Sequence, residues 1–72
     1  MHLKEYRARS LLTQGYMARS LMITQARYSR IETGITTPGM KLVNRIVALT
    51  NGAVGYKDLR PDIYEAVMGG KS

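Results

Sequence analysis

The sequence predicts a small all-α domain of five helices. Apolar residues recur at spacings of three and four in several segments, which is the period of an amphipathic helix. Thr13, Thr24 and Asp58 each precede one of these segments, where a side-chain oxygen can accept from the free N–H groups of a first helical turn. With 72 residues and no cysteine, the chain must be one domain held by close packing or by a partner.

The first two expected helices span residues 2–12 and 14–21. Leu3 and Tyr6 share one face of the first helix. Thr13 is a good cap for the second helix, which ends at residue 20 or 21 and turns Met17, Ala18 and Leu21 inward.

Residues 25–33 form the third expected helix, with Gly34 as a C-terminal stop. Residues 35–39 then form a loop. The fourth helix covers roughly 39–50, where apolar residues again recur at helical spacing and Asn51-Gly52 ends the run.

Residues 52–57 are expected to form a loop or one short extended piece around Val54. A last helix covers 58–67, because Asp58 can cap it and Pro61 falls in its first turn, where proline is tolerated. Residues 1–68 then make up the domain, and 69–72 are a flexible tail.

Positive charge is concentrated in the first two thirds of the chain. The net charge is +6, and residues 1–45 carry eight basic and two acidic side chains, whereas residues 46–72 carry three of each. A basic region of this kind commonly meets nucleic acid or an anionic membrane. The alternative interpretation is that the positive charge only keeps the protein soluble.

Several function classes find no support in the sequence. No apolar run approaches the ~20 residues of a membrane span, and no signal-peptide pattern is present, so we expect a cytoplasmic location and no membrane partner. One histidine and no cysteine make a metal site improbable. No catalytic set and no phosphate-binding loop is present, so we expect no enzyme, no cofactor and no small-molecule ligand.

Residues 14–33 have the pattern of a helix-turn-helix. Two helices that cross over a short turn need a small residue where they touch, and Ala18 lies at that place. The wedge behind the crossing would be filled by Leu21, Ile23, Tyr28 and Ile31.

The run "LLTQGYMARSLMITQARYSRIETGITTP", residues 11–38, resembles the lambda-type repressor and Cro family of helix-turn-helix regulators. The later stretch "DLRPDIY", residues 58–64, is similar to the end of small phage Cro-like and YdaS-like regulators. The resemblance implies a compact five-helix lambda-repressor-like domain in a bacterial cell or a phage-infected host. Three positions depart from the family pattern: Leu11 and Met22 stand where glycine is usual, and Tyr28 replaces an aliphatic residue.

The resemblance implies that the protein binds double-stranded DNA. In such proteins the glutamine that opens the second helix reaches a phosphate, and the one that opens the third touches base edges in the major groove. Here these are Gln14 and Gln25. A glutamine amide both accepts and donates in one plane, which suits adenine.

The third helix has a second face, away from Tyr28 and Ile31, and we expect it to contact DNA. Arg30 is the best candidate for reading guanine, and Ala26 offers a methyl contact to thymine. The small or hydrogen-bonding residues of this face are Thr24, Gln25, Ala26, Ser29, Arg30 and Thr33. Arg27, Thr36 and Lys41 are expected at phosphates.

The resemblance also implies that Arg7 and Glu32 form a structural ion pair. Within the neutral C-terminal third, residues 52–68 are expected to contact a second copy, as the C-terminal regions of Cro-like proteins do. The expected dimer residues are Val54, Tyr56, Ile63, Tyr64 and Val67.

The sequence therefore predicts a Cro-like repressor that binds a palindromic operator as a homodimer. An antitoxin or small-operon autoregulator would use the same chemistry. A protein-interaction module that does not bind DNA is the third reading.

Overall fold

The structure, a computed structural model, describes residues 1–69, which contain six α-helices and a final π-helical turn. In order, the elements are α1 (Leu3–Arg9), α2 (Gln14–Leu21), α3 (Gln25–Thr33), α4 (Met40–Leu49), α5 (Tyr56–Leu59), α6 (Pro61–Tyr64) and η1 (Glu65–Gly69). The all-α prediction is confirmed, and these residues contain no strand. Among them, no helix has the length and apolar character needed to cross a membrane.

Threonine caps fix the starts of α2 and α3. The Thr13 hydroxyl accepts from the Tyr16 N–H at 3.0 Å, and the Thr24 hydroxyl accepts from the Arg27 N–H at 3.1 Å. At α1 the cap is His2, whose Nδ1 accepts from the Lys4 N–H at 3.2 Å. These caps satisfy backbone donors that a helix leaves free at its first turn.

The connections after α1 and α2 contain residues in the left-handed backbone region. Leu11 has φ +58° and Met22 has φ +62°. They are the two positions where the resembled family usually has glycine, and a side chain in this backbone region costs about 1–2 kcal/mol of strain at each. Leu11 also ends the first helix earlier than predicted, because the chain leaves the helical region there.

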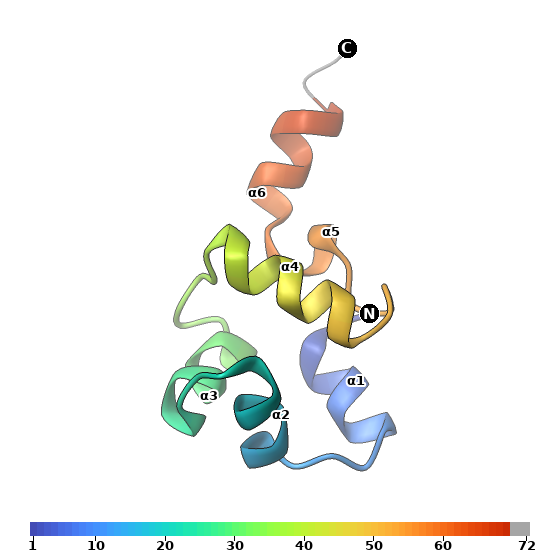
Figure 1. Cartoon of the computed structure of the whole chain (residues 1–72). Helices are drawn as coiled ribbons and strands as arrows, with labels where there is room; N and C mark the ends of the chain where they lie inside the picture. Colours follow the sequence, from blue (N-terminus) through green and yellow to red (C-terminus); the bar gives the residue numbers. More distant parts are fainter. Residues whose placement is uncertain (70–72) are drawn as a thin grey trace.

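The core lies where α1, α2, α3 and α4 meet (Figure 1). Ala18 is 3% exposed in this core, and its helix α2 packs against α3, so a larger side chain at Ala18 has little room. The side chains that are less than 2% exposed are Met17, Leu21, Tyr28, Val43, Ile46 and Val54.

The assignment of Val54 to a dimer contact is wrong. Its side chain is fully buried in the core of the monomer. Its N–H donates to the Thr50 hydroxyl at 3.1 Å, and that hydroxyl donates to the Ile46 carbonyl at 2.9 Å. These bonds fold the loop after α4 back over the core, and residues 50–55 form a loop without a strand.

The single helix predicted over 58–67 is also wrong, because α5 ends before Arg60 and α6 begins at Pro61. Arg60 has φ −138° and ψ 68°, since a residue before proline is kept out of the helical region. Asp58 lies inside α5, where its carboxylate accepts from the Gly55 N–H at 2.9 Å.

The segment formed by α6 and η1, which we call the C-terminal arm, projects from the helical body in Figure 1 and gives the molecule extents of 41 × 21 × 18 Å. Its main contact with another helix is with α5. The predicted flexible tail, residues 69–72, lies outside the described residues apart from Gly69.

Candidate nucleic-acid interface

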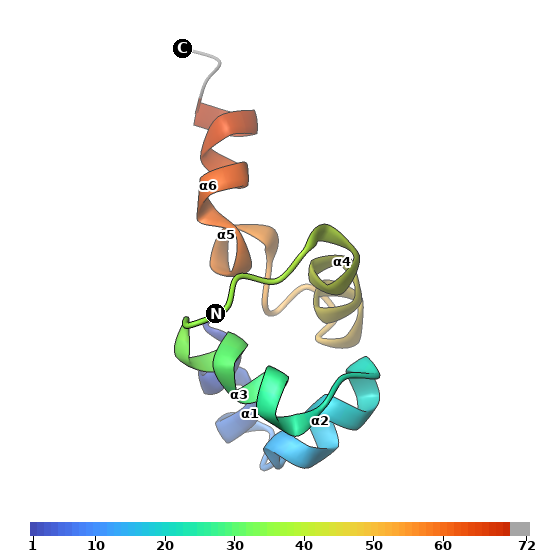
Figure 2. The ribbon, with the colours of Figure 1, turned by 90° about the vertical axis from the view of Figure 1, so that its left-hand side faces the viewer.

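Helix α3 has one buried and one exposed face. Figure 2 shows it at the near surface of the body, beside α2. Tyr28, Ile31 and Glu32 turn inward. The outward side chains are Thr24, Gln25, Ala26, Arg27, Arg30 and Thr33, with Ser29 half-buried beside them. The outward face therefore carries no acidic group.

The outward side chains differ in what they can still bind. No hydrogen bond or ion pair within residues 1–69 involves the guanidinium groups of Arg27 and Arg30. The Thr24 hydroxyl accepts from the backbone and keeps its proton available for donation. The Thr33 hydroxyl donates its proton to the Ser29 carbonyl at 3.0 Å, so it could bind a ligand only as a hydrogen-bond acceptor.

The side chain of Gln25 lies close to the first turn of α2. A Cβ atom placed on Gly15 would be 3.5 Å from the Gln25 Oε1 atom, at ordinary van der Waals distance. Gln25 at the start of α3 therefore lies beside Gly15, the residue that follows Gln14 in α2. Gln25 is exposed and Gln14 is half-buried.

Glu32 is the centre of a hydrogen-bond network that joins three helices. Its carboxylate is buried, with 3% of the residue exposed. Arg7 donates through Nε to Oε2 at 2.7 Å and through Nη2 to Oε1 at 3.1 Å. Gln14 Nε2 donates to Oε1 at 3.0 Å, and the Tyr28 hydroxyl donates to Oε2 at 2.8 Å. These four bonds use the roughly four acceptor positions of a carboxylate.

The network keeps Glu32 ionised despite its burial. Burial raises the pKa of the carboxyl, but the hydrogen bonds from Arg7, Gln14 and Tyr28 outweigh it and hold the pKa below the ordinary value. Burial, together with the bond to Glu32, raises the pKa of the Tyr28 hydroxyl well above its usual range. At neutral pH the site is therefore an anion, a cation and a neutral donor, all with fixed protonation states.

Part of the Gln14 amide is committed to this network. A phosphate oxygen only accepts, so Gln14 would meet phosphate through the other of its two amide N–H groups. The sequence did not reveal this link. The spacing of Tyr28 and Glu32 is a signal that could have revealed part of it, because residues four apart lie on the same side of a helix.

Basic side chains of α3 and α4 gather in one groove between the two helices. Arg27, Lys41 and Arg45 line a groove of about 260 Å³ between the helix-turn-helix and the start of α4. Lys41 is exposed in the first turn of α4, whereas Arg45 donates to the Leu21 carbonyl at 3.4 Å. Thr36 is half-buried in the loop that leads to α4. The groove thus gathers positive charge beside the exposed face of α3.

A family model for helix-turn-helix domains matches residues 3–56, well over half of the chain. The chain belongs to the lambda repressor/Cro-type helix-turn-helix family. This confirms the resemblance and supports a DNA-binding regulator of that type. The family is one of DNA-binding domains and not of enzymes. Neither a curated protein nor a solved structure matched the chain.

Proposed function

We propose that this helix-turn-helix protein is a sequence-specific repressor that reads double-stranded DNA through α3. One observation carries the proposal. The only acidic residue of α3, Glu32, is buried and paired with Arg7, so the outward face of the helix can approach DNA without a repelling charge.

The exposed side chains of α3 have the chemistry needed for base readout. The Arg30 guanidinium fits guanine O6 and N7, and the Gln25 amide fits adenine. Ala26 can contact the methyl group of thymine. We assign phosphate contacts to the exposed Arg27 and Lys41 and to the half-buried Gln14 and Thr36.

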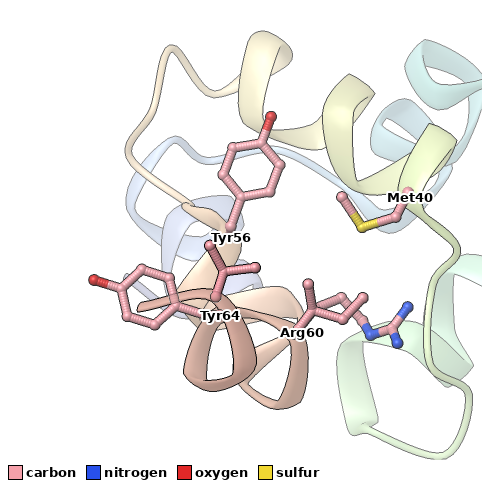
Figure 3. Close-up of a pocket in the computed structure, with 6 residues that line it drawn as sticks. Met40, Tyr56, Arg60 and Tyr64 are labelled. Atoms are coloured by element: carbon pink, nitrogen blue, oxygen red, sulfur yellow. The ribbon is translucent and has the colours of Figure 1, made fainter. Parts of the chain in front are cut away.

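An apolar groove of about 310 Å³ supports pairing with a second copy through the C-terminal arm. It is lined by Met40, Tyr56, Arg60, Ile63, Tyr64 and Val67, and Figure 3 shows the Arg60 guanidinium directed away from both tyrosine rings. All three nitrogens of that guanidinium are engaged, with Asp62 and the Pro38 carbonyl. The groove therefore offers apolar contact rather than a site for an anion.

Charge favours a second copy at this groove. Two molecules of net charge +6 repel each other. Residues 46–72 carry three basic and three acidic side chains, so two copies that meet through this part of the chain repel each other least. A two-fold dimer would place two α3 helices on half-sites about one helical turn of DNA apart, ~10 bp. Bound at a promoter, such a dimer would block polymerase by occupying the operator.

The DNA proposal is tested with the fragment that flanks the protein's own gene, against scrambled DNA at two salt concentrations. Arg30→Ala should lower affinity for the native fragment by about 5- to 150-fold, the equivalent of 1–3 kcal/mol, with little effect on scrambled DNA. Arg9→Ala is the control, because Arg9 is an exposed residue of α1 paired with Glu5. Equal, steeply salt-dependent binding of both DNAs would leave only the phosphate contribution and contradict sequence-specific readout.

The dimer proposal is tested separately by analytical ultracentrifugation at micromolar concentration, with and without DNA. Val67, which is 61% exposed in the groove, is replaced by glutamate, and Ile35→Glu is the control at a residue that is 77% exposed elsewhere. We expect Val67→Glu to produce monomers and Ile35→Glu to leave the dimer intact. A wild-type protein that remains monomeric on DNA would refute the dimer.

A further inference from the structure

The Tyr28 hydroxyl stands out because the helix-turn-helix packing does not require it. Tyr28 is fully buried, and its ring fills the position that the family usually gives to an aliphatic side chain. The hydroxyl reaches beyond that packing and donates to Glu32 Oε2 at 2.8 Å. An aliphatic residue would fill the core without making this bond.

The hydroxyl bond fixes how the Glu32 carboxylate is shared. Oε2 accepts from Tyr28 and from Arg7 Nε, so Oε1 is left for Gln14 and Arg7 Nη2. If the hydroxyl were absent, Oε2 would have an open acceptor position in a buried site. The carboxylate or a neighbouring donor would then move to fill it, because an unsatisfied buried acceptor is costly.

Gln14 connects this buried site to the surface. It is the first residue of α2 and half-buried, and one of its two amide N–H groups is held by Glu32 at 3.0 Å. A tethered side chain has lost rotational freedom before DNA arrives, so less affinity is lost in ordering it on binding.

We propose that Tyr28 is a positioning residue for DNA binding: acting through Glu32, it holds the Gln14 amide so that its second N–H is presented to a DNA phosphate. This inference rests on the proposed function. The inference assigns a role to Tyr28, a buried residue that would not touch DNA. Tyr28 would nevertheless set the strength of the contact between Gln14 and a DNA phosphate.

A double-mutant cycle on the DNA fragment tests this role, at one salt concentration and at a temperature where every variant is folded by circular dichroism. Gln14→Ala should weaken binding about tenfold, which corresponds to a lost hydrogen bond of ordinary strength. Tyr28→Phe should weaken it about three- to fivefold in the wild-type background and leave it unchanged in the Gln14→Ala background. Tyr6→Phe is the control, since Tyr6 is a half-buried tyrosine packed against the same core.

The two backgrounds separate positioning from a merely structural role. A structural role predicts the same loss of affinity from Tyr28→Phe in both backgrounds, and that result would overturn the proposal. The expected result is a loss only where Gln14 is present. If the wild-type protein shows no preference for any DNA, the proposed function fails instead, which is a different outcome from additive losses.

A second measurement needs no substitution. In the nuclear magnetic resonance spectrum of the free wild-type protein, the two side-chain amide protons of Gln14 should differ in hydrogen exchange, with the one bonded to buried Glu32 protected. DNA should then shift the other proton. Two equally exposed protons would contradict a tethered amide and overturn the proposal, even if Tyr28→Phe failed to fold.

Discussion

Replacing Arg7 by methionine tests the ion pair that joins α1 to α3. The substitution removes two hydrogen bonds to Glu32 and one, at 3.1 Å, to the Leu12 carbonyl. It leaves the carboxylate of Glu32, a residue that is 3% exposed, with only the neutral donors Gln14 and Tyr28. Breaking one side of a buried pair costs about 3–5 kcal/mol. The Arg7 side chain is 20% exposed, so water can replace part of the bonding and we expect the lower end, about 3 kcal/mol.

The assay is urea denaturation, which gives the free energy of unfolding, together with thermal melting. For a domain of this size, about 3 kcal/mol corresponds to a fall in melting temperature of roughly 12–24 °C. The matched control is Arg9→Met, because Arg9 pairs with Glu5 on the surface of α1 and both side chains are largely exposed. An exposed pair of that spacing contributes about 0.3–0.5 kcal/mol.

Two results would refute this reasoning about Arg7. One is a loss below about 1 kcal/mol, which exposed pairs also reach. The other is a double variant, Arg7→Met with Glu32→Gln, whose loss equals the sum of the single losses. Partners in one network should instead be non-additive, because the second substitution removes the charge that the first left unpaired.

Three further predictions concern acid, a turn and the helix crossing. The folded pKa of Glu32 lies below its ordinary value of 4.5, so its contribution to stability is complete above about pH 4.5 and is lost as pH falls through the folded pKa. Urea titrations from about pH 5 downward should show this slope, and Glu32→Gln should flatten it. Met22→Gly should raise the free energy of unfolding by up to about 1 kcal/mol, because glycine adopts φ +62° without strain but loses more backbone entropy on folding; a loss of stability on urea titration would contradict that. Ala18→Leu should lower it by about 1–3 kcal/mol by overpacking the contact of α2 and α3, and unchanged melting would mean that the helices do not touch there.

The helix-turn-helix was predictable because its signals are local. Thr13 and Thr24 stand directly before the helices that they cap, and Gly34 ends α3 with φ +86°. The apolar spacing also identified the inward residues, including Ala18 and Tyr28. A cap, a stop and a periodic face need no knowledge of distant parts of the chain.

The C-terminal third was harder to predict because its structure depends on distant contacts. The burial of Val54 follows from bonds to Thr50 and from the way that the loop folds over the core, which no local pattern indicates. The break at Arg60 did have a local signal, since Pro61 follows it, and proline restricts the residue before it.

The sequence predicted which residues of α3 are exposed on the candidate DNA surface. It did not predict the buried hydrogen bonds beneath that surface. Exposure of one face of α3 follows from the burial of the other face. The bond from Gln14 to Glu32 joins residues 18 apart in the chain. Only the fold brings them together, so sequence spacing could assign each residue a separate role but could not show that they act through one carboxylate.

The projection of the C-terminal arm has a consequence for how such regulators diverge. The family match ends at residue 56, before the arm, and the arm packs mainly against α5. Exposed arm residues such as Val67 lie on a different segment from the exposed face of α3. Under the proposed pairing through the arm, mutations in the arm would change which copies associate and leave the residues of the exposed face of α3 unchanged. Duplicated genes that differ only in the arm would then give two regulators that bind the same DNA sequence but form no mixed dimers.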